Sequence, residues 1–270
     1  MAEISTSEQQ WLRRWNLGMG FLHLIQGLIM LFLSKTQTFT LVLNLPKPNP
    51  AIRSVTLQPE KWLEINLGWA IASFLLLSAV AHFITLIPAI NKWYVNNLSK
   101  QMNLIRWWEY ALSSSLMVVV IAALCGINDG SIMILLFVVN ACMNLFGAVM
   151  EKHNSALKQL ATQLKESYKT DWTAFVYGSI AGAAPWVVMG IYFFTAVNRV
   201  NEFFKIPDFV YWIFPTLFVF FNLFAINMFL QYKGVGPWKN YTFGEKAYIF
   251  LSLAAKSTLA WIIWGGTLRP

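Results

Sequence analysis

Seven long apolar runs, separated by short polar segments, dominate this sequence. Each run holds roughly 20 residues or more with few charges, which is the length that an α-helix needs to cross a bilayer core. Lipid offers no hydrogen-bond partner to the backbone, so segments of this kind cross it as helices. The pattern predicts an all-α membrane protein, a bundle of seven transmembrane helices. The predicted spans are Trp11–Ser34, Trp62–Ile90, Met102–Cys125, Ser131–Met150, Trp172–Val197, Pro207–Gln231 and Phe243–Trp264.

The longest segment between two spans, about residues 36–59, has a different period. Thr38, Thr40, Val42 and Asn44 alternate with Phe39, Leu41, Leu43 and Leu45. A period of two is typical of a half-buried strand, and the following "PKPNP" is typical of a turn. We therefore expect an external β-hairpin between the first two helices, lying over the bundle or against a partner subunit. An irregular loop is the alternative.

The composition agrees with a membrane protein and argues against a nucleic-acid-binding one. Of the 270 residues, 57% are hydrophobic and only 12% are charged, whereas soluble domains carry about 25% charged residues. The formal net charge is +8. The lysines and arginines form short clusters between the apolar runs, which is where membrane proteins place them. The sequence thus predicts a multi-pass protein of the cell membrane, with the lipid bilayer as its partner.

The distribution of lysine and arginine between the two sets of loops predicts the orientation. One set holds Arg13, Arg14, Lys92, Lys100, Arg106, Lys152, Lys158, Lys165, Lys169, Lys233, Lys239 and Lys246. The other holds Lys35, Lys47, Arg53, Lys61, Arg199, Lys205 and Arg269. Because cytoplasmic loops carry the larger share, the first set is predicted to be inside. The N-terminus is then cytoplasmic and the C-terminus external.

Two charges lie where a bilayer disfavours them. Lys256 is near the middle of the last span, in "LSLAAKSTLAW", and Glu109 is the one acid well inside a span, in "RWWEYALSSS". Each would cost several kcal/mol alone, so we expect them to pair. Counted from the predicted cytoplasmic ends, Glu109 lies about 10 Å deep and Lys256 about 20 Å deep. This difference in depth closes if the third helix begins earlier, near Asn97, and if the two side chains lean toward each other.

Three interpretations of the pair remain open from the residues alone. It could be a structural salt bridge that fixes helix packing, or a proton-relay pair in a transporter. In the third interpretation, which we favour, the amine of Lys256 condenses with an aldehyde to form a Schiff base. A long conjugated aldehyde bound as a protonated imine needs one carboxylate as counter-ion, which Glu109 would supply.

Further polar residues inside the spans predict a cavity around the pair. Ser252 lies one turn before Lys256, and Ser113 lies one turn after Glu109, so each shares a face with its charge. Other spans contribute His23, Gln26, Ser78, His82 and Asn140. The histidines lack the H-x₃-H or E-x-x-H spacing of a zinc site, so we predict no bound metal.

Several motifs together resemble those of heliorhodopsins. They are "LSAVAHF", "RWWEYALSSS", "VVNACMNLFG", "LQYKGVG", "GEKAYIFLSLAAKSTLAW" and the hairpin after the first span. The resemblance implies a microbial-type rhodopsin fold with an inverted, N-terminus-inside topology. It implies all-trans retinal on Lys256 with Glu109 as counter-ion, and a homodimer with the hairpin at its interface. The positions that match the family's polar cavity are His23, Gln26, Ser78, His82, Tyr110, Ser113, Asn140, Ser252 and Trp261.

A comparison with outward proton pumps separates the candidate functions. Pumps place an aspartate one turn before the lysine, where this chain has Ser252, and a second carboxylate three turns after the counter-ion, where it has Val120. The sequence therefore favours a non-enzymatic light sensor that signals to an unidentified cytoplasmic partner. A light-gated passive proton conductor is the second hypothesis. The third is a non-photoactive seven-helix transporter with a structural ion pair.

Overall fold

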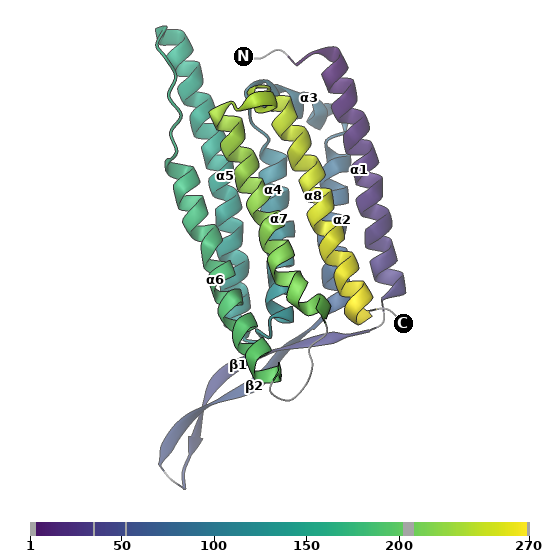
Figure 1. The fold of residues 1–270 in the computed structure, drawn as a ribbon, viewed down its shortest axis with the longest axis vertical. Helices are drawn as coiled ribbons and strands as arrows, with labels where there is room; N and C mark the ends of the chain where they lie inside the picture. Colours follow the sequence, from purple (N-terminus) through teal and green to yellow (C-terminus); the bar gives the residue numbers. More distant parts are fainter. Residues whose placement is uncertain (1–3, 35, 52, 202–207, 269–270) are drawn as a thin grey trace.

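The computed structural model describes residues 4–34, 36–51, 53–201 and 208–268, and it contains the predicted bundle (Figure 1). Seven helices in this part of the chain are long and apolar enough to cross a membrane. They are α1 (Thr6–Leu33), α2 (Leu67–Ile84), α4 (Leu104–Leu124), α5 (Gly130–Leu164), α6 (Thr173–Asn201), α7 (Asp208–Lys233) and α8 (Tyr241–Ile263). A 3-10 turn, Gly236–Lys239, precedes α8, and a π-helical turn, Trp264–Leu268, follows it. The predicted fold class is confirmed.

Four residues used in the predictions lie outside the described ranges. These are Lys35, Lys205 and Arg269 of the loop charge count, and Pro207 at the predicted start of the sixth span.

Polar side chains define where the helices begin. Ser5 and Glu8 form a capping box at the start of α1. Asn103 begins α4 by accepting a hydrogen bond from the backbone N–H of Arg106, and Asn240 does the same for Thr242 at the start of α8. Such caps satisfy backbone N–H groups that have no partner within the helix.

The predicted hairpin is present and longer than expected. Strand β1 (Thr38–Asn49) pairs antiparallel with β2 (Ser54–Asn66). The predicted start of the second span at Trp62 is therefore wrong, because Trp62 is the extra residue of a β-bulge and Leu63–Asn66 pair with Thr38–Leu41 in the ladder. Asn66 then caps α2. Glu64 is a residue of the hairpin, where it pairs with Lys61.

The hairpin projects away from the bundle beyond its base (Figure 1). The expected half-buried strand is confirmed only at the base of the hairpin, where Leu41 is buried and Phe39 and Leu43 are partly buried. From Asn44 onward β1 is exposed. At the base, Val42 bonds Asn128 through the backbone, and Asn44 donates to Asp129 at 2.9 Å. Hydrogen bonds from the backbone of Ile132, and also from Asn44, hold the pKa of Asp129 below its usual range.

A short helix that the sequence analysis did not predict connects α2 to α4. Helix α3 (Pro88–Ser99) starts with proline in its first turn and lies across the end of the bundle opposite the hairpin (Figure 1). The predicted second span, Trp62–Ile90, is therefore too long at both ends. The third transmembrane helix begins at Leu104, so the earlier start near Asn97 is also wrong.

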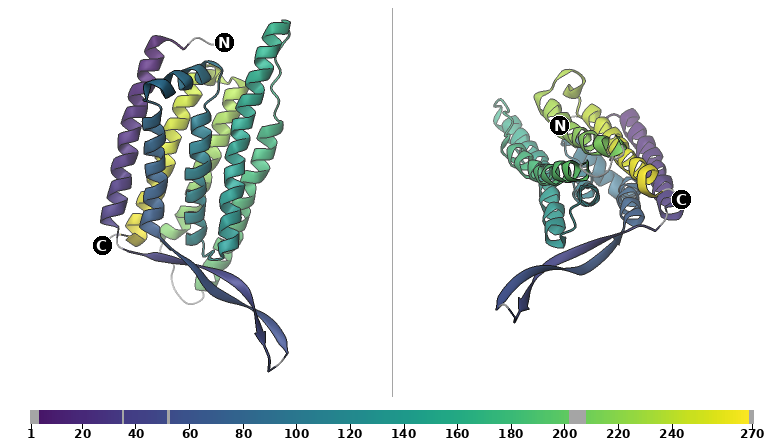
Figure 2. Two further views of the ribbon diagram at one scale, coloured as in Figure 1. Left: turned by 180° about the vertical axis from the view of Figure 1, so that it is seen from behind. Right: turned by 60° about the horizontal axis from the view of Figure 1, so that its bottom comes forward.

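Helix α5 continues well past its predicted end at Met150. It has 35 residues and ends at Leu164, so its last turns stand above the neighbouring helices (Figure 2). Those turns are polar, which is why a hydropathy criterion ended the span early. We call residues 151–164 the α5 overhang.

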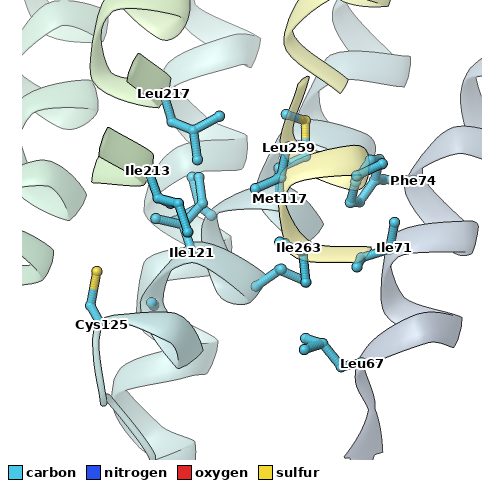
Figure 3. Packing of buried hydrophobic residues seen from close by; sticks show 14 of the residues in the cluster. Leu67, Ile71, Phe74, Met117, Ile121, Cys125, Ile213, Leu217, Leu259 and Ile263 are labelled. Carbon is cyan, nitrogen blue, oxygen red and sulfur yellow. The ribbon is translucent and has the colours of Figure 1, made fainter. Parts of the chain in front are cut away.

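The half of the bundle that faces the hairpin has a dry core. Residues from α2, α4, α7 and α8 interdigitate there, including Ile71, Phe74, Met117, Ile121 and Ile263 (Figure 3). This packing fixes the helices on that side, and the functional candidates lie toward the opposite end.

Candidate functional site

The structure brings the two intramembrane charges together. Nζ of Lys256 donates to Oε1 of Glu109 at 2.8 Å, and the two side chains are 3% and 8% exposed. Nζ also donates to Ser252 Oγ, one turn back, at 2.8 Å. Side chains of a helix lean toward its N-terminus. The side chain of Lys256 therefore extends back toward the predicted cytoplasmic end of α8, where Glu109 lies at a smaller depth.

Two hydroxyl groups and one aromatic ring complete the surroundings of the pair. Ser78 on α2 donates to the same Oε1 of Glu109 at 2.6 Å. Ser113 is fully buried one turn along α4 from Glu109. The ring centroid of Tyr110 lies 5.1 Å from Nζ of Lys256. The carboxylate therefore has a cation and a hydroxyl on one oxygen, which holds it in place.

His23 and His82 lie near each other beside this pair. Their rings stack with centroids 5.6 Å apart, and Nδ1 of His82 is 2.8 Å from Oδ1 of Asn16. Both nitrogens of His23 are buried, and no side chain or backbone group in the described ranges bonds them. Unpaired buried polar atoms of this kind mark places where a water molecule or polar ligand binds.

Three predicted residues lie apart from this group. Trp261 donates to Gln26 at 2.9 Å, but its side chain is 39% exposed on the outer surface of the bundle. Asn140 on α5 donates to Ser114 and Ser115 of α4. It therefore braces α4 from the side opposite His23 instead of contacting Lys256.

A polar cavity of about 400 Å³ extends from the pair toward the end of the bundle that carries α3. Glu109, Ser78 and Ser252 line one part of it, and Arg106 and Glu245 line another. It links the predicted site to a second buried charged group.

That second group corrects the prediction that Glu109 and Lys256 are the one buried acid and base. Arg106 bonds the carboxylates of both Glu151 and Glu245, and all three residues are at most 5% exposed. The sequence did not reveal the cluster, because Glu151 directly follows the predicted end of its span and because Arg106 and Glu245 lie at the polar ends of theirs.

The neighbours of the cluster satisfy most of its remaining hydrogen-bonding groups. The indole of Trp107 and the backbone N–H of Asn103 each donate to Glu151 Oε2 at 2.7 Å. The guanidinium of Arg106 lies 3.9 Å from the ring centroid of Tyr248. A side chain at Gly147 would collide with the indole of Trp107, so this glycine lets the ring pack closely against α5.

Substitution of Asn103 tests how much the cluster stabilises the protein. It caps α4 and also donates to Glu245. Replacement by alanine leaves a buried carboxylate one donor short, and we expect Asn103→Ala to lower stability by about 2 kcal/mol. This corresponds to a fall of about 5 °C in the melting temperature. Asn96→Ala, on the exposed side of α3, is the control and should change it by less than about 1 °C. Equal melting temperatures for the two variants would contradict the assigned role.

Apolar cavities on the other side of Lys256 fit a long conjugated ligand. One, of about 390 Å³, reaches Lys256 itself and is walled by Met117, Phe221 and Phe224. A second, of about 540 Å³, shares Tyr110 and Phe224 with the first and continues between α4, α5, α6 and α7. A reactive amine at the end of an apolar space, with a carboxylate behind it, matches the donor set that a retinal aldehyde requires.

Comparisons with known proteins agree with this geometry. The family model described as Heliorhodopsin matches residues 12–268. The crystal structure of Exiguobacterium sibiricum rhodopsin superposes over 96% of this chain and 95% of that chain, with a TM-score of 0.56 at 14% identity. At this identity the likeness shows the fold alone. A search among curated protein sequences finds no match.

Proposed function

Because the chain belongs to the heliorhodopsin family, we propose that this retinal-binding membrane protein is a light sensor in which Lys256 holds the chromophore. Bound retinal supplies visible absorption and a light-driven change of shape. Lys256 provides the amine for its covalent attachment, as the all-trans isomer, and Glu109 provides the counter-charge 2.8 Å away. Ser78 and Ser252 orient these two groups through their hydrogen bonds.

The observation that carries this proposal is the one-sidedness of the polar cavity. From Glu109 it extends toward Arg106 and Glu245, whereas toward the hairpin the bundle is filled with apolar side chains such as Ile121 and Leu259 (Figure 3). Proton transfer across a membrane needs polar groups on both sides of the active group, because each transfer requires hydrogen-bond reach. A proton released beside Glu109 therefore stays on one side of the membrane, which supports sensing over pumping.

A voltage-clamp measurement tests the proposal. Cells that express the protein with retinal should show a visible absorption band and no light-dependent current above that of untransfected cells. A steady photocurrent that follows the proton gradient would contradict the sensor and establish the second candidate, a light-gated passive proton conductor. Ser252 and Val120 occupy the positions where outward pumps carry carboxylates, which favours that candidate over a pump. A colourless protein would favour the third hypothesis, a transporter with a structural ion pair.

We propose that the N-terminus is cytoplasmic and the C-terminus external, on the basis of the loop charges. Two exposed positions report on this orientation: Lys47 in the hairpin and Glu166 after the α5 overhang. A membrane-impermeant maleimide applied to intact cells should label Lys47→Cys and leave Glu166→Cys unlabelled. The parent chain is the control, since Cys125 is buried and Cys142 lies within the membrane-spanning part of α5. The reverse pattern would contradict the orientation.

Two N-x-S/T glycosylation sequons, "NLS" at Asn97 and "NYT" at Asn240, are weak reporters of the orientation. Asn97 is 7% exposed and belongs to α3, and Asn240 caps α8. A lack of sugar on either would have a structural explanation whatever the orientation.

We further propose a homodimer that uses the hairpin. On β2, Val55 is 67% exposed and Leu57 is 70% exposed, and Trp62 and Leu63 are about half exposed. An exposed apolar surface of this kind is typical of an interface. The signalling partner is proposed to bind on the cytoplasmic side, toward which the polar cavity extends.

A further inference from the structure

The end of the bundle that carries α3 has a second kind of hollow, unrelated to the chromophore. A cavity of about 460 Å³ lies between the α5 overhang and the turn after α3. Its lining is polar and basic: Ser99, Lys100, Gln101, Ser155, Lys158, Gln159 and Thr162. We propose that it binds a phosphate-bearing anion, either the headgroup of an anionic lipid or a soluble phosphate compound.

The charges of the cavity favour an anion. Lys100 and Lys158 approach from its two walls, and the residues that line it include no aspartate or glutamate. A neighbouring cavity of about 300 Å³ shares Gln101 and adds a third cation, Lys239. Lysine ammonium groups bind phosphate as point charges with three donors each. Without a carboxylate to neutralise them, these cations leave a positive potential at the site.

The hydrogen-bonding groups are already arranged around the space. Gln101, held at a positive φ of 60°, accepts from Nζ of Lys158 at 2.9 Å and so fixes that ammonium group at the rim. Ser155 is 7% exposed and accepts from Gln159. No acceptor in the described part of the chain takes the proton of its hydroxyl, which is free to donate to a phosphate oxygen.

The end of α3 offers little opposition to an anion. Carbonyl oxygens at a helix C-terminus repel negative charge, but here they are engaged. Ser99 donates to the carbonyl of Asn96, and the turn that follows donates to the carbonyls of Asn97 and Leu98.

The position of the cavity allows the phosphate group of a membrane lipid to reach it. The overhang rises from the membrane-spanning part of α5 on the side that the proposed orientation places in the cytoplasm. Anionic lipids are concentrated in that leaflet. Soluble phosphate compounds reach the same cavity from the cytoplasm, so binding measurements must separate the two sources.

Two probes on the full chain, purified in uncharged detergent, make that distinction. The first is inorganic phosphate, titrated by calorimetry. The second is native mass spectrometry of bound phosphatidylglycerol against phosphatidylcholine. Preferential retention of phosphatidylglycerol with weak phosphate binding would identify a headgroup site. Saturable phosphate binding without a lipid preference would identify a soluble ligand.

In either case Lys100→Gln and Lys158→Gln should each weaken the binding that is observed by about tenfold. Lys169→Gln is the matched control: it removes the same charge from an exposed position beyond the overhang that does not line the cavity. Unchanged melting temperatures will show that the variants are folded. The proposal is overturned if neither probe binds, or if the control loses as much affinity as the other two variants. Neither result would bear on the proposed light sensor, whose colour is measured separately.

Discussion

Lys256→Ala yields a protein without a visible absorption band when it is supplied with retinal. No imine can form without the amine, and in the structure Lys256 reaches both the apolar cavity and Glu109. Absorption spectra of the purified variant and parent, followed by acid denaturation to detect covalently attached chromophore, measure the effect. Loss of the band should be complete.

Two control variants isolate the chemistry of the amine. Lys256→Arg keeps a positive charge beside Glu109 but also remains colourless, because a guanidinium does not condense in this way. Lys246→Ala removes a lysine from the same helix, one that lies over the ring of Trp11, and should keep the full band. Covalent retinal in Lys256→Ala would disprove the attachment site.

Glu109→Gln should move the visible band to longer wavelength. It should also lower the pH above which the band is lost through deprotonation of the imine. Two opposite unit charges about 4 Å apart attract by about 4 kcal/mol at an effective dielectric of about 20. Loss of that attraction destabilises the protonated imine, so the titration midpoint of the band should fall by about three pH units. The colour changes because the counter-charge stabilises the ground state more than the excited state, in which positive charge has moved away from the nitrogen.

A pH titration of the band in halide-free buffer measures both effects. Chloride is left out because a bound anion could replace the carboxylate. Glu64→Gln serves as the control and should change nothing, since Glu64 lies in the hairpin and pairs with Lys61. If Glu109→Gln leaves colour and midpoint unchanged, Glu245 becomes the acid to test, because it lines the same polar cavity.

The sequence was sufficient to predict the bundle, the hairpin and the meeting of Lys256 with Glu109. Hydrophobic length determines transmembrane helices directly, and a buried charge needs a partner of opposite sign. The boundaries were less accurate, because hydropathy measures transfer to lipid and not helical hydrogen bonding. The polar overhang of α5 was therefore left out of its helix, and Trp62–Asn66 of β2, in which three of five residues are apolar, was assigned to a transmembrane helix.

The cluster of Arg106, Glu151 and Glu245 could not be predicted in the same way. Each of its members lies near the end of a predicted span, where a charged side chain ordinarily extends to the interface. Only the tertiary packing of α4, α5 and α8 turns these three inward together. Likewise, the separation of Gln26, Trp261 and Asn140 from Lys256 depends on helix rotation, which a single sequence leaves undetermined.

The unbroken course of α5 has a mechanical consequence. A helix of 35 residues is a stiff rod about 52 Å long. It is braced by Asn140 and Asn144 within the bundle and by Glu151 at the bundle's end. The α5 overhang continues for about 20 Å beyond Glu151, and a hydrogen bond from Lys158 to Gln101 tethers its middle. A tilt of about 5° at Glu151 would displace the tip by about 2 Å, far more than any atom near the pivot would move. A spin label at the end of the α5 overhang would therefore report a small tilt of α5 as a measurable change in its distance from a label on the bundle.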